Sequence, residues 1–219
     1  MQSFTIETTT HGRYLVRSPA RLDAPAPLVV GFHGYSENAD AHMQELSRIP
    51  GSEAWLLVAV QGLHRFYARA EAIAASWMTR QDRELAIADN VAYVDRVVAA
   101  VRRAHPSAGG LALLGFSQGA SMAFRMAALG AERPRAIVTL AGDVPPEIRS
   151  ATAASFPRAL VARGERDTWY TAARSDADVA FLRSVGTLVE PLTFDGGHEW
   201  NDAFRSAAGE FLARTLAGG

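Results

Sequence analysis

The stretch Leu111–Ala120 constrains the fold of this chain most, because it joins a strand-like segment to a helix-like one through a glycine-rich turn. A short apolar run ends in Gly115-Phe-Ser-Gln-Gly119, and small helix formers follow at once. A turn this sharp forces Ser117 into a strained backbone conformation, and a Cβ at either glycine would collide with the neighbouring strand or helix. The segment therefore predicts a nucleophile elbow that holds the Ser117 hydroxyl clear of a sheet.

Two downstream segments carry the partners that a serine nucleophile needs. Asp167 follows the apolar run Ala159–Ala162, and His198 follows Leu188–Phe194. Both residues therefore come just after a predicted strand, as Ser117 does, and this is where open α/β sheets place their ligands. Because a free serine hydroxyl is a weak nucleophile, His198 would take its proton, and Asp167 would hold the imidazole in the required tautomer. The order predicts a catalytic triad.

Asp143 is a rival for the triad acid, because it follows the preceding predicted strand, Ala136–Leu140. We favour Asp167 and interpret Asp143 as a turn residue near the substrate pocket. Asp195 lies too close to His198 in the sequence to be the first choice, and we expect it to fix the adjacent glycine turn.

The tripeptide His33-Gly34-Tyr35 follows the buried strand predicted for Leu28–Phe32. In proteins with a nucleophile elbow, this loop supplies one oxyanion-hole N–H, and the residue after the nucleophile supplies the other. The predicted donors are therefore the backbone amides of Tyr35 and Gln118. We interpret His33 as a residue that braces the loop and not as the base.

Aromatic and apolar side chains near these motifs are candidates for an acyl pocket, although core packing is an equally good interpretation of each one. The stretch from Gln61 to Arg80 has no clear periodicity, and whether it forms a partial lid stays open. The predicted pocket residues are Trp77, Met122, Asp143 and Trp169. The other histidines show no metal spacing and are interpreted as surface or loop residues: His11, His42, His64 and His105.

Short continuous apolar runs alternate with amphipathic helical segments, which predicts an α/β fold with a mostly parallel central sheet and helices on both faces. Phe4–Glu7 and Arg13–Val16 flank a glycine-containing turn and predict an N-terminal antiparallel hairpin. With 219 residues, the chain is expected to form a single domain over residues 1–219. The predicted strands are Leu28–Phe32, Trp55–Val60, Leu111–Leu114, Ala136–Leu140, Ala159–Ala162 and Leu188–Phe194, and helical faces are predicted within 87–101, 120–128 and 200–211.

The composition and charge indicate which kinds of binding partner to expect. A formal net charge of −1 gives no reason to expect nucleic acid or an anionic membrane surface. Since there is no cysteine, disulfides and thiol catalysis are excluded. The N-terminus lacks a basic region followed by an apolar core, so no signal peptide is expected. We expect a cytoplasmic protein with no stable membrane insertion and a small-molecule substrate.

These motifs together resemble the phospholipase/carboxylesterase family of α/β-hydrolases, which are small lid-less serine esterases that include acyl-protein thioesterases. The resemblance spans about residue 28 to 212. Two departures bear on acyl preference: Ser36 stands where many members carry glycine, and Thr168-Trp169 replaces a small apolar segment after the acid. The matching segments are Phe32-His-Gly34, Ser76-Trp-Met78, Gly115-Phe-Ser-Gln-Gly119, Ala141-Gly-Asp-Val-Pro145, Asp167 and Gly197-His198.

The resemblance implies hydrolysis of carboxylic esters or thioesters, with no metal and no organic cofactor. We therefore expect a serine carboxylesterase that acts on short- to medium-chain esters or thioesters through a Ser-His-Asp triad and an acyl-enzyme. Two alternatives stay open. One is a non-catalytic binding protein with the same fold, and the other is a peptidase or transacylase, because the triad does not choose the acceptor.

Overall fold

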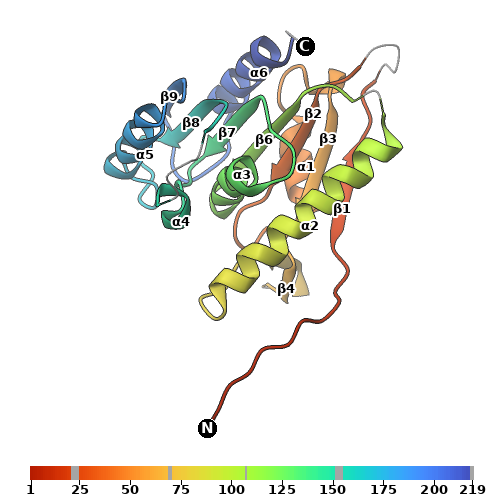
Figure 1. The fold of residues 1–219 in the computed structure, drawn as a ribbon. Helices are drawn as coiled ribbons and strands as arrows, with labels where there is room; N and C mark the ends of the chain where they lie inside the picture. The colour runs from red at the N-terminus through yellow and green to blue at the C-terminus, as the bar shows by residue number, and fades with distance from the viewer. Residues whose placement is uncertain (21–24, 69–70, 107, 151–154, 218–219) are drawn as a thin grey trace.

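A seven-stranded sheet forms the middle of the protein (Figure 1). The computed structural model describes residues 1–20, 25–68, 71–106, 108–150 and 155–217. All neighbouring strands are parallel except the β1–β3 pair, which is antiparallel. In spatial order the strands are β1 (Arg13–Arg17), β3 (Leu56–Gln61), β2 (Leu28–Phe32), β6 (Leu111–Phe116), β7 (Ala136–Leu140), β8 (Arg158–Gly164) and β9 (Val189–Phe194).

Helices cover both faces of the sheet, as predicted (Figure 1). One face packs against α2 (Arg83–Ala104), α3 (Gln118–Leu129), the short α4 (Pro146–Arg149) and α5 (Ala172–Ser184). The other face packs against α1 (Ala39–Ser47) and α6 (Asp202–Leu216), and a single 3₁₀ turn, η1 (Ser52–Ala54), precedes β3. This layered arrangement brings the carboxyl ends of β2, β6, β7, β8 and β9 to one edge.

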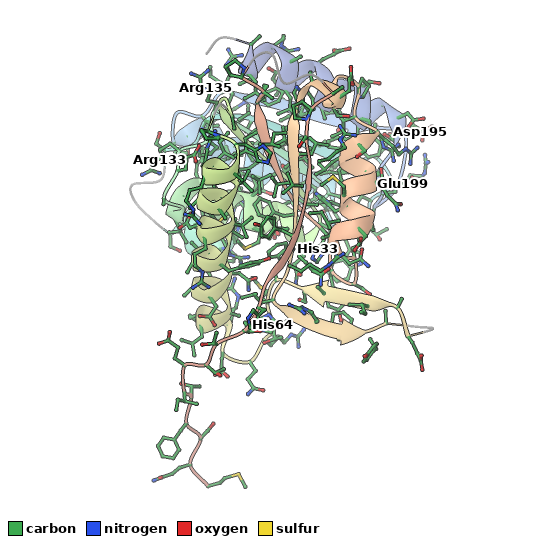
Figure 2. The ribbon with its side chains drawn as sticks, turned by 90° about the vertical axis from the view of Figure 1, so that its right-hand side faces the viewer. His33, His64, Arg133, Arg135, Asp195 and Glu199 are labelled. Atoms are coloured by element: carbon green, nitrogen blue, oxygen red, sulfur yellow. The ribbon has the colours of Figure 1, made fainter. Side chains whose placement is uncertain are left out.

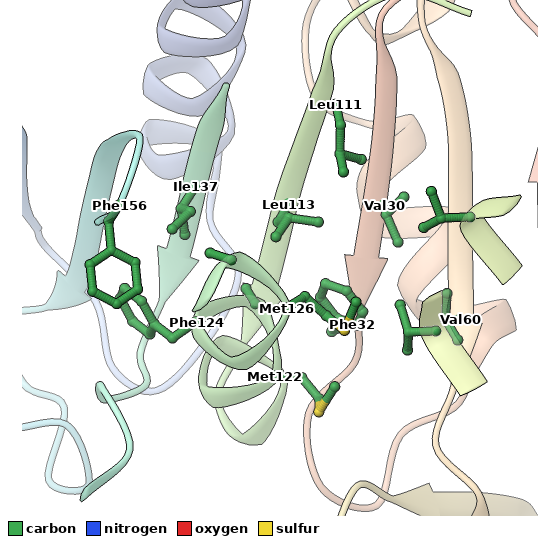
Figure 3. Packing of buried hydrophobic residues seen from close by; sticks show 14 of the residues in the cluster. Val30, Phe32, Val60, Leu111, Leu113, Met122, Phe124, Met126, Ile137 and Phe156 are labelled. Atoms are coloured by element: carbon green, nitrogen blue, oxygen red, sulfur yellow. The ribbon is translucent and has the colours of Figure 1, made fainter. Parts of the chain in front are cut away.

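The hydrophobic core lies in two layers, because alternate residues of each buried strand point to opposite faces. In β2, Val30 packs in the layer beneath α3, and Val29 packs in the layer beneath α1. Figure 3 shows the first layer, which includes Leu113 of β6 and Met122 of α3. Met122 is fully buried there, among core residues, and its place in the substrate pocket stays a prediction.

The N-terminal hairpin predicted over Phe4–Val16 does not form. Residues 1–12 contain no strand, and Phe4 and Ile6 are 84% and 92% exposed. β1 pairs instead with the buried strand β3, where Leu15 packs against the core. Gly12 is needed for a close approach and not for a turn, because a Cβ there would lie 2.0 Å from the ring of Tyr93.

The aperiodic stretch between Gln61 and Arg80 contains a second, separate antiparallel pair. β4 (His64–Tyr67) and β5 (Ile73–Ser76) form a two-stranded sheet that projects from the carboxyl edge of the central sheet (Figure 2). An isolated bridge between Glu37 and Ala75 attaches this hairpin to the loop after β2. The hairpin is thus fixed beside the predicted oxyanion loop.

Candidate active site

The strand, sharp turn and helix predicted around Ser117 are present between β6 and α3. Ser117 has φ 52° and ψ −117°, a conformation that L-residues rarely adopt. Its N–H donates to Leu140 O at 2.8 Å. A Cβ on Gly115 would lie 2.2 Å from Gly119 O, and one on Gly119 would lie 2.0 Å from Phe32 O. The two glycines are therefore required by the close approach of β6, α3 and β2.

Ser117, His198 and Asp167 lie in hydrogen-bond contact, in that order. Ser117 Oγ lies 2.8 Å from His198 Nε2, and His198 Nδ1 lies 2.9 Å from Asp167 Oδ2. The His198 side chain is 30% exposed, whereas that of Asp167 is fully buried. This geometry can move the hydroxyl proton onto the imidazole while a buried carboxylate faces the opposite ring nitrogen.

The second carboxylate oxygen of Asp167 is held by its own loop. Asp167 Oδ1 accepts from the backbone N–H of Trp169 at 2.8 Å and of Tyr170 at 2.9 Å. The Tyr170 hydroxyl in turn donates to the buried Asp178 of α5 at 2.7 Å. The carboxylate therefore has a fixed orientation, with one oxygen bound to backbone and the other directed at His198.

Asp143 does not join this set. It is exposed, and its nearest hydrogen-bond contact is the Ser121 hydroxyl, which lies 3.4 Å from Oδ1 and 3.1 Å from the Asp143 carbonyl. Asp195 is also exposed and pairs with Arg166 at the surface. Of the three aspartates considered from the sequence, Asp167 is the one beside His198.

His33 braces the loop that follows β2. Its Nε2 accepts from the Gly62 N–H at 3.0 Å, so Nδ1 carries the proton and donates to Gly34 O at 2.7 Å. Burial lowers the pKa of His33 to about 4. Figure 2 shows His33 close to the base of the β4–β5 hairpin. A buried, neutral imidazole with both nitrogens engaged holds the backbone and is not available as a base.

Glu37 is a further side chain in this loop that the motif did not reveal. Its Oε2 accepts from the Gly34 N–H at 2.7 Å, and its own N–H donates to Gly34 O at 3.3 Å. Burial raises the pKa of Glu37, partly opposed by the bond from Gly34. The carboxylate closes the turn around Tyr35. No pattern in the sequence distinguished this glutamate from a solvated one.

The two predicted oxyanion donors are free to bind a ligand. Neither the Tyr35 nor the Gln118 backbone N–H donates to another of the described residues. The Gln118 side chain, by contrast, is fully engaged: Oε1 accepts from Trp77 N at 2.9 Å, and Nε2 donates to Ser76 Oγ at 3.1 Å. The sequence pointed to the Gln118 amide but gave no signal for this side chain.

The remaining pocket predictions divide by exposure. Trp77 is fully buried, and its Nε1 donates to His33 O at 2.8 Å. Its ring therefore packs in the core, and its place in the pocket stays a prediction. Trp169 is 73% exposed two residues beyond Asp167, and Asp143 is exposed beside Ser121. These two side chains remain pocket candidates.

A chain of aromatic rings runs from the site into the core behind it. Phe116 lies 5.3 Å from His198 and 5.9 Å from Trp200, and Trp200 lies 5.6 Å from His42, measured between ring centroids. His42 was expected at the surface, but it is 1% exposed on the inner face of α1. Neither of its ring nitrogens has a hydrogen-bond partner among the described residues. Burial lowers the pKa of His42 to about 3.

We expect the two buried histidines to make the fold sensitive to acid. The unfolded chain binds a proton on each near pH 6.5, whereas folded His33 and His42 stay neutral down to about pH 4 and pH 3. The free energy of unfolding should therefore fall as the pH drops below 6.5, by roughly 1.4 kcal/mol per pH unit for each histidine. Urea unfolding between pH 7 and 4.5 measures this slope.

The control separates His42 from the other titrating groups. His42→Leu should remove one of the protons that the chain takes up on unfolding. The dependence of the free energy of unfolding on pH should therefore fall by roughly 1.4 kcal/mol per pH unit. His11→Gln, which changes an exposed residue of the N-terminal segment, should leave the slope as in the wild type. Equal slopes in His42→Leu and the wild type would contradict the assignment.

No group of three or more His, Cys, Asp or Glu side chains among the residues that the structure describes is placed to hold a metal ion. No helix in that part of the chain combines the length and the apolar character needed to cross a membrane.

Comparison with known structures identifies the fold as that of the α/β-hydrolases. Esterase PE8 matches with a TM-score of 0.75 and 24% identity, over 94% of this chain and 98% of its own. Acyl-protein thioesterase 2 from Zea mays matches with a TM-score of 0.72 and 18% identity, over 94% and 100%. A carboxylesterase from Mesorhizobium loti matches with a TM-score of 0.71 and 20% identity, over 85% and 88%. At these identities the likeness establishes the fold alone.

The family follows from a sequence comparison. The profile of the serine hydrolases called FSH1 matches residues 28–199, and the chain belongs to this family. A comparison with curated proteins gave no match. The expected resemblance to serine esterases is thus confirmed at the level of a serine hydrolase of the α/β-hydrolase fold.

Proposed function

We propose that this chain is a carboxylic ester hydrolase that cleaves short- to medium-chain esters or thioesters through an acyl-enzyme on Ser117. The observation that carries the proposal is the unbroken series of contacts from Ser117 Oγ through His198 to the buried Asp167, at 2.8 and 2.9 Å. Membership of a serine hydrolase family and the esterase and thioesterase names of the structural neighbours support it.

In the proposed mechanism, His198 Nε2 takes the Ser117 proton as Oγ attacks the substrate carbonyl carbon. The negative oxygen of the tetrahedral intermediate accepts from the free amides of Tyr35 and Gln118, each worth about 3 kcal/mol in the transition state. Asp167 stabilises the imidazolium that forms. His198 then protonates the departing alcohol or thiol, and a water molecule, activated by the same base, releases the acid from Ser117.

A panel of substrates tests the reaction class. Purified protein should hydrolyse p-nitrophenyl esters and the matching acyl thioesters, with the highest kcat/KM among chains of about two to eight carbons. Peptide amides should be much poorer substrates. A fluorophosphonate should add once, and mass spectrometry should place the adduct on Ser117.

Four results would contradict the proposal or favour one of its alternatives. An adduct on another residue, or Ser117→Ala retaining most of the esterase activity, would show that the nucleophile lies elsewhere. Absence of turnover on every ester and thioester, with a folded protein, would instead favour a non-catalytic binding protein. Acyl transfer to an added alcohol that outpaces hydrolysis would favour a transacylase.

A further inference from the structure

The two amides of the proposed oxyanion hole come from different parts of the chain. Tyr35 lies in the loop after β2, and Gln118 begins α3 after β6. The two donors must nevertheless converge on one oxygen. Hydrogen bonds weaken steeply when their geometry is poor, and a misplacement of about 1 Å in a catalytic site can cost about 100-fold in rate. Something must therefore fix the spacing between these two loops.

Strand β5 is bonded to the Tyr35 loop through its backbone. The Ser36 N–H donates to Ala75 O at 3.2 Å, and the Ala75 N–H donates to Glu37 O at 2.8 Å. These two bonds bracket Ala75 and hold the residues that immediately follow Tyr35. Ser36 is kept at φ 65°, in the left-handed region. The loop conformation thus depends on the hairpin beside it.

The same strand is bonded to the Gln118 side through a side chain. Gln118 Oε1 accepts from the Trp77 N–H at 2.9 Å, and Gln118 Nε2 donates to Ser76 Oγ at 3.1 Å. The Ser76 hydroxyl donates its own hydrogen bond to Met78 O at 2.7 Å. Ser76 and Trp77 are 3% and 0% exposed, so water does not readily replace these bonds. The first residue of α3 is thus tied to the residues at the end of β5.

We propose that β5 is the frame that sets the spacing of the oxyanion hole, and that the Gln118 side chain is the positioning group which couples the nucleophile elbow to that frame. The inference rests on the proposed function of Ser117. The Gln118 side chain acts through its own backbone N–H and touches no reacting atom. Its loss should weaken the transition state more than the bound substrate, because the oxyanion forms only in the transition state.

The test uses Gln118→Met, which keeps the backbone N–H and the side-chain length but removes both hydrogen bonds. We expect kcat for a p-nitrophenyl ester to fall by about 10- to 100-fold, with KM within about threefold of the wild type. The Kd of butylboronic acid, which binds as a tetrahedral adduct on Ser117, should rise by a similar factor. The Trp77 amide should exchange its hydrogen faster, because it loses its acceptor.

Ser76→Ala provides a second route that preserves Gln118. It should lower kcat by about three- to tenfold, and the double variant should be no slower than Gln118→Met, because the same contact is already lost. Ser52→Ala removes another buried serine hydroxyl, bonded to Ser47 O far from the site, and should leave kcat unchanged. Thermal unfolding of each variant separates lost rate from lost structure.

The outcomes distinguish this inference from the proposed function. Wild-type kcat in a folded Gln118→Met, or a change confined to KM with unaltered boronate affinity, would overturn the positioning role. If the losses in kcat of Gln118→Met and Ser76→Ala multiplied in the double variant, the two residues would not act through one shared contact, and the frame would be overturned. If the wild type hydrolyses no ester, the proposed function fails, and hydrogen exchange still decides: unchanged exchange at Trp77 and at residues 34–37 overturns the frame.

Discussion

Ser117→Ala and His198→Ala should each lower kcat for ester hydrolysis by about 10⁵-fold or more, and the double variant should be no slower than either single one. The reason is that the hydroxyl and the imidazole act as one unit across their 2.8 Å contact. Without the base the hydroxyl is a weak nucleophile, and without the hydroxyl the base has no proton to take. The release of p-nitrophenol from p-nitrophenyl butyrate, followed over hours at high enzyme concentration, measures the residual rates.

The control for these two variants is a measurement that each one is still folded. Both side chains are part-exposed at the site, so their loss should leave circular dichroism and the unfolding midpoint close to those of the wild type. Fluorophosphonate should fail to label Ser117→Ala and should label His198→Ala far more slowly. A double variant much slower than both single variants would show that the two residues act in separate steps. His33→Ala as inactive as His198→Ala, yet folded with its loop intact, would reopen the choice of base.

The middle of the central sheet was predictable because β2, β3, β6 and β7 are buried on both faces. Leu28–Phe32 has no polar side chain and Ala136–Leu140 has only Thr139, and the structure gives strands with those bounds. α1 and α5 were harder to find, because their inner faces carry polar residues. His42 lies on the buried face of α1, and Asp178 lies on that of α5. A periodicity of apolar residues misses a helix whose core face is partly polar.

Some features of the candidate site follow from short sequence motifs, and others depend on contacts between segments far apart in the chain. The elbow and the order of Ser117, Asp167 and His198 are local features, and the sequence predicted residues that the fold brings into contact. The attachment of Gln118 to Trp77 joins segments far apart in the chain and depends on where the β4–β5 hairpin lies. Trp77 itself combines the two kinds of contact. Its ring lies in the core, whereas its backbone N–H donates to the Gln118 side chain.

Asp167→Asn should lower kcat by roughly 10²- to 10⁴-fold. The carboxylate now accepts from the Trp169 and Tyr170 amides through Oδ1 and faces His198 Nδ1 through Oδ2. In the variant the amide oxygen would keep the two backbone bonds, which leaves the NH₂ group facing Nδ1. Nδ1 would then have to accept, and the proton would move to Nε2, where it faces Ser117 Oγ. The imidazole would be in the tautomer that cannot act as the base.

Asp143→Asn is the matched control, because it makes the same chemical change one strand earlier. Asp143 is exposed and contacts Ser121, and no bond joins it to His198 among the described residues. We expect its kcat to stay within a few fold of the wild type, with any effect appearing in KM as a change in the pocket. Unfolding must be measured beside rate for both variants, because Asp167 also closes its own loop. If Asp143→Asn lost the larger factor in kcat while both variants stayed folded, the triad acid would lie after β7, and the bonds that hold Asp167 would serve the loop alone.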